Sequence, residues 1–203
     1  MSKQVYISAD YSEDSGDRNV VEELIRWGKD SQHVTDFIDM SKVSSGSVSN
    51  DPDCRICDLK AEFNRQINAS SAVIIVVGDK TACRTAGSAC DRCTKEQWAC
   101  TCTPYKHNSS GAKPCRVALT STPAPDGDFG NINACSYIEH EFRQAQKKNK
   151  PIIVVYNSIY YQPSWLPSYM SHYESVARPF WVRNSLGYRV GNYSFIKQAL
   201  GYV

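Results

Sequence analysis

Two side chains in the carboxyl-terminal half of the sequence have the types and spacing of a small-molecule binding site. Tyr137 and Glu141 are four residues apart, so on a helix they lie on the same flank. Phe142 belongs to an apolar stripe with Ile138 and Ala145, which places Glu141 beside the buried face. An aromatic ring next to a partly buried carboxylate can form a pocket wall with a negative charge at its base. Such a carboxylate could do acid–base chemistry or stabilise a developing positive charge.

A second group of candidates, Ser8, Asp10 and Tyr11, lies at the end of a predicted strand. The stretch Lys3 to Ala9 has alternating apolar residues, which is typical of a strand. In an open parallel sheet, ligands bind at the carboxyl ends of the strands, close to the point where the strand order reverses. In this chain that edge comprises Ser8 to Ser12, Asp39 and the Ser-rich loop after it, Gly78 to Thr81, and the start of the predicted helix at Cys135. Small polar residues also end strands for structural reasons alone, so Ser8 and Asp10 could instead be turn residues.

The motifs of several enzyme classes are missing from the sequence. It holds neither the GxGxxG pattern of standard Rossmann sites nor the GxxxxGK[ST] pattern of phosphate-binding loops. There is no GxSxG elbow, and the four histidines do not suggest a Ser-His-Asp triad. Carboxylates are therefore the candidates for catalysis. On the predicted helix, His140 is expected to be exposed and Glu139 to lie nearer the solvent than Glu141.

The elements that position these residues alternate between strands and helices. The apolar runs Ala72 to Val77 and Ile152 to Val155 are not interrupted by polar residues, which is typical of parallel strands covered on both faces. The fold class is therefore predicted as α/β, a doubly wound, mostly parallel sheet of the flavodoxin-like type. The other predicted elements are a strand around Thr35 to Ile38, a helix through Val20, Val21, Leu24 and Trp27 that follows the capping-type residues Asp14 to Asp17, a helix through Ile56, Leu59, Phe63 and Ile67, a helix from Cys135 to Lys150, a last strand at Val176 to Val182, and a closing helix from Tyr193 to Leu200 capped by Asn192.

The length predicts one domain, because domains hold roughly 150 residues and the chain has 203. We expect residues 1–203 to form it. Residues 79–133 interrupt the spacing of the predicted strands and form a loop-rich insertion that holds six of the nine cysteines. One short strand is predicted within this insertion, at Arg116 to Leu119. Residues 157–203 are an aromatic carboxyl-terminal extension.

The nine cysteines are the unusual feature of the composition. Their odd number argues against a full set of disulfides, and so does the lack of an export signal. Cys54-x-x-Cys57 and Cys90-x-x-Cys93 have the spacing of zinc ligands, but the two pairs lack the short separation of a zinc ribbon. A structural zinc ion in the insertion therefore competes with free thiols, which we favour, and no residue is assigned as a metal ligand.

Charge and hydropathy limit the kinds of partner that the chain can have. It has 23 basic and 21 acidic side chains and a net charge of +2, a balance that does not favour nucleic-acid binding through phosphate contacts. The longest apolar runs are far shorter than the ~20 residues that cross a bilayer. The amino terminus lacks the pattern of a secretory signal. We therefore expect a cytoplasmic protein whose partners include neither nucleic acid nor membrane.

Taken together, several of these segments resemble the TIR family, specifically bacterial TIR-like proteins of the Thoeris antiphage type. The third helix of that family carries an aromatic-x-x-x-Glu signature, which Tyr137-x-x-x-Glu141 matches with Tyr in place of the usual Trp. A turn rich in Lys and Asn, Lys147 to Lys150, and the strand Pro151 to Val155 follow in the family's order. Val5 to Tyr11 looks like the family's opening strand, three hydrophobic residues followed by Ser-x-x-Tyr. The resemblance covers residues 3–80 and 134–156, about half of the chain, and the insertion departs from the family's pattern.

This resemblance implies cleavage of the nicotinamide N-glycosidic bond of NAD, with NAD as substrate and no cofactor required. Glu141 would face the positively charged ribosyl centre, and Tyr137, Ser8, Asp10 and Tyr11 would line the nucleotide pocket. The product would be an ADP-ribose-derived signal, often cyclic, that is made in antiphage defence and sensed by a separate effector. A homo-oligomer would also be compatible with the resemblance.

Two other classes of function stay open. The chain could be a non-catalytic TIR-like scaffold, in which case the insertion and the aromatic extension would be contact surfaces. It could also be a nucleoside-processing enzyme of the deoxyribosyltransferase type, which shares an α/β sheet and a single carboxylate nucleophile. Without the resemblance, Glu141 would be read as a solvated helix residue paired with a basic neighbour.

Overall fold

The sheet at the centre of the molecule consists of five parallel strands. The computed structural model describes residues 3–11, 15–29, 35–39, 52–84, 107–108, 111–112 and 136–202, and only the backbone of residues 52–57, 107–108 and 111–112. The strand order is β2-β1-β3-β6-β7, the order of flavodoxin-like sheets. This confirms the predicted α/β class. The strands are β1 (Lys3–Ser8), β2 (Thr35–Asp39), β3 (Ala72–Val77), β6 (Ile152–Tyr156) and β7 (Arg178–Pro179).

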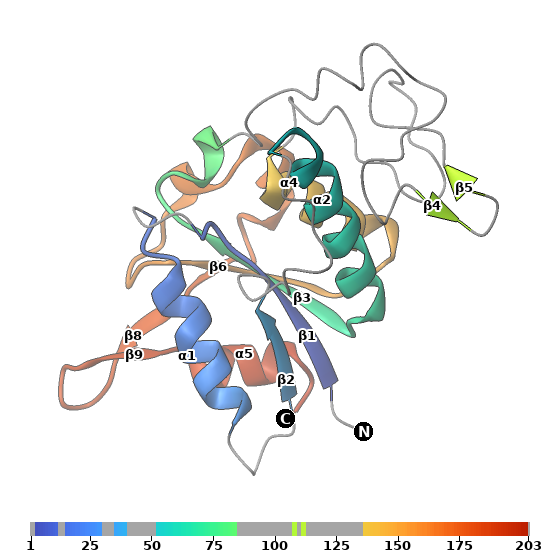
Figure 1. Cartoon of the computed structure of the whole chain (residues 1–203). Coiled ribbons are helices and arrows are strands. Elements are labelled where there is room, and N and C mark those ends of the chain that lie inside the picture. The colour runs from blue at the N-terminus through green and yellow to red at the C-terminus, as the bar shows by residue number, and fades with distance from the viewer. Residues whose placement is uncertain are drawn as a thin grey trace.

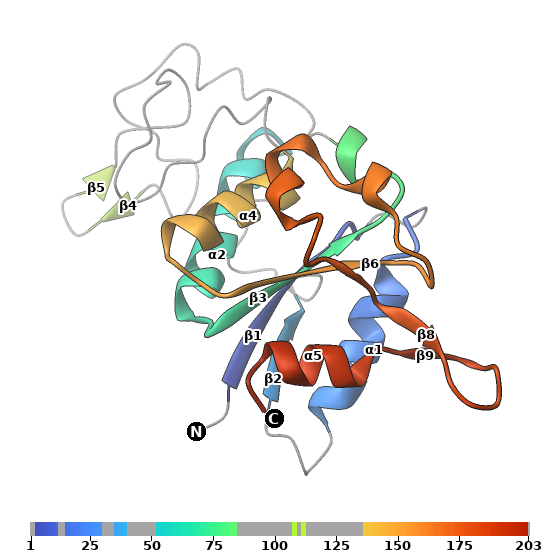
Figure 2. The same ribbon diagram turned by 180° about the vertical axis from the view of Figure 1, so that it is seen from behind.

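Two pairs of helices cover the two faces of this sheet. Helices α1 (Arg18–Gly28) and α5 (Tyr193–Ala199) lie on one face, and α2 (Pro52–Ala69) and α4 (Tyr137–Lys147) lie on the other. Figures 1 and 2 show this layering from opposite sides. Strand β3 is central and every one of its residues is buried, as its unbroken apolar run predicted.

The alternation along each strand divides the interior into two apolar clusters. Val5 and Ile7 of β1 point toward α1 and α5, where they pack with Leu24 and Ile196. Tyr6 points toward α2 and α4 and belongs to the other cluster. The polar Ser8, two residues further along β1, is also fully buried. The side of the sheet that faces α4 therefore carries hydroxyl groups at the end of β1.

Helix α1 begins at the predicted place, but its capping differs from the expected pattern. Asp17 occupies the N-cap position without accepting a hydrogen bond from the first turn. Its carboxylate accepts one instead from Asn157, which follows β6. By contrast, Asn192 caps α5 as predicted, since its side chain accepts a hydrogen bond from the Phe195 backbone N–H.

The strand predicted over Val176 to Val182 is wrong in its extent. The structure divides this segment into the edge strand β7 and a separate hairpin, which β8 (Trp181–Arg183) forms with β9 (Arg189–Gly191). Pro179 has no N–H to donate to a neighbouring strand, and such residues are found at edges and ends of sheets. The hairpin projects from the body of the molecule (Figures 1 and 2).

Most of the predicted insertion, residues 79–133, lies outside the described residues. The described parts are 79–84, which include a 3-10 helix at Thr81–Cys83, and the two-residue strands β4 (His107–Asn108) and β5 (Gly111–Ala112). The strand expected at Arg116 to Leu119 and the pair Cys90 and Cys93 lie outside as well. No helix in the described part of the chain is long and apolar enough to cross a membrane.

Candidate functional site

Glu141 is buried between α4 and the sheet. Helix α4 starts after Ser136, whose hydroxyl accepts a hydrogen bond from the Glu139 N–H at 3.1 Å and thereby caps the helix. Ile138 and Phe142 anchor the helix in the apolar cluster shared with α2. The sequence predicted a carboxylate at the edge of this stripe. Glu141 is in fact only 4% exposed, so burial is deeper than the pattern indicated.

Two hydroxyl groups of β1 hold the Glu141 carboxylate. The Tyr6 hydroxyl donates to Oε1 at 2.8 Å, and the Ser8 hydroxyl donates to Oε2. Both donors reach the same side of the sheet because they are two residues apart on one strand. The structure thus brings Ser8, one of the candidate site residues, into contact with Glu141. Tyr6 was missed, although its place two residues before Ser8 was a signal that both share a face.

The environment of Glu141 favours a neutral carboxyl more than water does. Burial raises the pKa of Glu141 to about 7, against the opposing effects of the Ser8 and Tyr6 hydrogen bonds and of the positive charge of Lys60. The side chain of Lys60, on α2, is itself fully buried. A carboxyl with a pKa near neutrality can be ionised inside a desolvated site, where its charge acts more strongly than in water. Lys60 is a second residue that sequence reasoning did not select.

Tyr137 lies one helical turn before Glu141 and packs against α2. Its ring meets Phe63 edge to face, with the ring centroids 5.6 Å apart. The side chain is half-buried at the border of the apolar cluster. The structure therefore places Tyr137 on the flank that the spacing predicted.

His140 contradicts the expectation that it is exposed. It is 5% exposed, and its Nε2 lies 2.9 Å from Oδ1 of Asn64 on α2. Burial and the charge of Lys60 lower the pKa of His140 to about 3, so the ring is neutral. The prediction failed because the apolar stripe of α4 gave no sign that α2 carries polar partners at the facing positions. Glu139 is half-buried and pairs with Arg143, and it is more exposed than Glu141, as the sequence predicted.

Asp10 and Tyr11 lie just beyond the end of β1. The carboxylate of Asp10 forms an ion pair with Arg84, from the segment after β3, with Nε and Oδ2 2.5 Å apart. Tyr11 is half-buried and packs against both apolar clusters. The structure thus brings Ser8 and Glu141 into contact and leaves Asp10 and Tyr11 at the same sheet edge with other partners.

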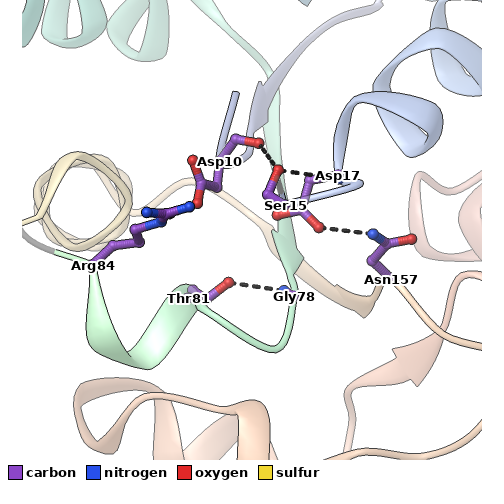
Figure 3. A network of polar contacts seen from close by, with 7 residues as sticks. All are labelled: Asp10, Ser15, Asp17, Gly78, Thr81, Arg84 and Asn157. Carbon is purple, nitrogen blue, oxygen red and sulfur yellow. Dashed lines mark hydrogen bonds and ion pairs between the residues drawn. The ribbon is translucent and has the colours of Figure 1, made fainter. Parts of the chain in front are cut away.

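A second buried carboxylate, Asp17, lies at this edge on the side of α1. It accepts a hydrogen bond from the Asn157 amide at 2.9 Å, and its Oδ2 has no hydrogen-bond partner among the described residues (Figure 3). Burial raises the pKa of Asp17 to about 7. Gly78 lies so close that a Cβ at this position would be 2.7 Å from Asp17 Oδ1. Asp17, Gly78 and Asn157 therefore join the ends of α1, β3 and β6, and none of the three was selected from the sequence as a site residue.

The sequence matches no protein-family model, and no curated protein matches it significantly. Within the described ranges, no three His, Cys, Asp or Glu side chains are grouped so that they could hold a metal ion. Of the cysteines considered as zinc ligands, Cys90 and Cys93 lie outside these ranges, and the description of Cys54 and Cys57 is limited to the backbone.

Proposed function

We propose that the protein is a TIR-like enzyme that cleaves the nicotinamide N-glycosidic bond of NAD. The observation that carries this proposal is the buried carboxylate of Glu141, whose two oxygens accept hydrogen bonds from Tyr6 and Ser8 at the end of β1. The strand order is compatible with a ligand site here, because it reverses between β1 and β3. The resemblance of Tyr137-x-x-x-Glu141 to the signature of TIR-like proteins supplies the choice of NAD.

The reaction requires little more than a correctly placed negative charge. When the C1′–N bond breaks, its electron pair goes to the ring nitrogen, so the pyridinium leaves as neutral nicotinamide and needs no proton. Positive charge then develops on the ribosyl centre, as in other oxocarbenium-like transition states. The ionised Glu141 stabilises that charge more than it stabilises the ground state, which lowers the barrier.

The other residues of the site hold Glu141 and bind the substrate. The Tyr6 and Ser8 hydroxyls fix the orientation of the carboxylate, so little reorganisation is needed during the reaction. Ser8, Asp10 and Tyr11 line the nucleotide pocket, and Tyr137 supports its wall. The ribosyl centre is captured by water, by a hydroxyl of the substrate or by its adenine base. Intramolecular capture gives a cyclic ADP-ribose derivative, which we propose as an antiphage signal sensed by a separate effector.

The decisive experiment compares Glu141→Gln with the wild-type chain. Purified protein is incubated with NAD, and released nicotinamide and ADP-ribose products are quantified by chromatography and mass spectrometry. The same products are measured in phage-infected cells that carry each variant, because such proteins can require an infection signal. We expect Glu141→Gln to lower product formation by about 100-fold or more, since the carboxylate acts on the developing charge.

Glu139→Gln is the matched control, because it makes the same change two residues away on the same helix. It removes the charge that pairs with Arg143 and leaves the Ser8 and Tyr6 contacts in place. We expect it to retain product formation. Equal product formation by wild type and Glu141→Gln would disprove the assignment of the catalytic residue. No NAD-derived product in infected cells that carry the wild-type chain would disprove the proposed activity.

One observation favours the alternative of an interaction module. Five large apolar side chains are exposed among the described residues 136–202: Tyr160, Tyr161, Val176, Leu186 and Tyr188. Exposed apolar surface of this kind can serve as a contact surface for a partner. Two of them lie in the projecting β8–β9 hairpin region (Figure 1). If this alternative is right, Leu186→Ser and Tyr188→Ser abolish self-association measured by light scattering, while Glu141→Gln has no phenotype in infected cells.

A further inference from the structure

The ion pair between Asp10 and Arg84 lies at the point where the strand order reverses. Asp10 follows β1, and Arg84 follows the 3-10 helix Thr81–Cys83 after β3. The two strands are direct neighbours, with Val5 opposite Ala72 in the register. Figure 3 shows Arg84 reaching across the sheet edge to Asp10. In open α/β sheets this is the place where ligands bind.

The guanidinium of Arg84 donates to the carboxylate of Asp10. Oδ2 of Asp10 lies 2.5 Å from Nε, which is the inner nitrogen of the planar group. A guanidinium carries several N–H donors in one plane and is well suited to bind phosphate oxygens. The Arg84 side chain is 34% exposed and that of Asp10 13%, so solvent reaches the arginine more than the aspartate.

The segment that carries Arg84 is held by its own hydrogen bonds. The Gly78 N–H donates to the Thr81 hydroxyl at 2.8 Å, and the Thr81 N–H donates to the Gly78 carbonyl at 3.2 Å. Thr81 is buried, so this turn is fixed against the end of β3. The Arg84 backbone N–H in turn donates to the Thr81 carbonyl. Arg84 therefore extends from a structured turn, and this limits the entropy that its side chain loses on binding a ligand.

The charges at this edge match the two charged parts of NAD, its cationic nicotinamide ring and its anionic diphosphate. Glu141 lies beneath the end of β1 and suits the cationic nicotinamide ribosyl group. The described segments that follow β1 and β3 contain two lysine or arginine residues, Lys80 and Arg84. Both follow β3. We propose that Arg84 binds the diphosphate of the dinucleotide and that Asp10 is a positioning residue that fixes the guanidinium. This inference rests on the proposed function and names how the same site recognises its substrate.

A purely structural role makes a different prediction. A partly exposed ion pair contributes little to stability, typically under about 1 kcal/mol. If the pair only ties together the chain segments after β1 and β3, the loss of Arg84 affects every substrate of the site to the same extent. A diphosphate ligand instead makes the effect depend on whether the substrate carries phosphate.

The test therefore compares two substrates with the same scissile bond. The full chain is assayed with NAD and with nicotinamide riboside, which lacks the diphosphate. We expect Arg84→Gln to lower kcat/KM for NAD about 10- to 100-fold more than for nicotinamide riboside, as the loss of a charge-assisted contact predicts. Arg84→Lys keeps the charge without the planar fork and should lie between wild type and Arg84→Gln. Arg26→Gln is the control, because Arg26 lies in the last turn of α1 and is highly exposed.

A binding measurement separates failure of this inference from failure of the proposed function. ADP-ribose is titrated calorimetrically into Glu141→Gln and into the double variant that also carries Arg84→Gln. We expect the double variant to bind at least about tenfold more weakly. Equal binding, or equal losses on both substrates, overturns the role of Arg84. Absence of NAD-derived product in infected cells that carry the wild-type chain, together with ADP-ribose binding that depends on Arg84, overturns the enzymatic proposal and supports the diphosphate site.

Discussion

Ser8, the last residue of β1, donates a hydrogen bond to Glu141 of α4, although 133 residues separate the two in the chain. Tyr6 donates to the other oxygen of the same carboxylate. A helix on one face of the sheet and the strand beneath it thus share one buried charge. The orientation and the protonation of Glu141 both depend on where β1 ends.

The proposed activity should depend on pH through Glu141. In the proposed mechanism the carboxylate form is the active one, and burial raises the pKa of Glu141 to about 7. We therefore expect the rate of nicotinamide release to rise with pH and to reach half of its maximum near this value. Ser8→Ala removes a hydrogen bond that lowers the pKa, so it should shift the rise to higher pH. Rates measured across a pH series test this, with Ser71→Ala, an exposed serine that bonds the Gln4 carbonyl, as control. An unchanged profile for Ser8→Ala would contradict the proposed role of the bond.

Tyr6→Phe should destabilise the fold, and more so at high pH. The substitution leaves the ring in the apolar cluster and removes the hydroxyl that donates to Glu141. Because a hydrogen bond to an ionised group is stronger than one to a neutral group, we expect a loss of about 1–3 kcal/mol when Glu141 is ionised, and less when it is protonated. Chemical denaturation at pH values on either side of the pKa of Glu141 measures the difference. Tyr161→Phe, at a more exposed hydroxyl, is the control. A loss of stability for Tyr6→Phe that does not change with pH would contradict a hydrogen bond from Tyr6 to the ionised carboxylate of Glu141.

The part of this architecture that periodicity determines could be predicted from the sequence. The unbroken apolar runs of β3 and β6 indicate strands covered on both faces, and the stripe of Ile138 and Phe142 indicates how α4 is oriented. These patterns reflect burial, which is the dominant driving force of folding. The pairing of Tyr137 with Glu141 on one flank follows from helix geometry alone.

Polar contacts between distant segments could not be predicted in this way. The burial of His140 depends on Asn64 of α2, and the burial of Glu141 depends on Tyr6 and Ser8. Each of these contacts replaces hydrogen bonds to water that the side chain loses on burial. The spacing of apolar residues gives no information on which polar side chains will meet.

His140 should make the protein sensitive to acid. Its folded-state pKa is lowered to about 3 from an ordinary value of 6.5. Between these two values the unfolded chain binds a proton that the folded chain does not, so stability falls as pH falls through this range. The raised pKa values of Glu141 and Asp17 act in the opposite direction. Below these values the folded chain binds protons at the two carboxyl groups that the unfolded chain does not yet bind, so their contribution to stability rises as pH falls. The difference between wild type and His140→Gln isolates the histidine contribution.

We expect His140→Gln to lose less stability than wild type when the pH is lowered from 7 toward 4, although the variant can be less stable at pH 7. Urea denaturation at several pH values measures both effects. His172→Gln, at an exposed histidine, is the matched control and should follow wild type. Parallel curves for wild type and His140→Gln would mean that His140 can be protonated within the folded protein.

Gly78→Ala should destabilise the junction of β3 with α1 because of one short contact. A Cβ at this position would lie 2.7 Å from Oδ1 and 3.2 Å from Oδ2 of Asp17. Asp17 is buried and bonded to Asn157, so its carboxylate cannot move aside without losing that hydrogen bond. We expect a loss of about 1–3 kcal/mol in the free energy of unfolding, measured by urea denaturation. Asp17→Ala in the same chain removes the atoms that clash, so the double variant should be more stable than the sum of the two single losses predicts. Strict additivity would show that the cost of Gly78→Ala arises elsewhere in the turn.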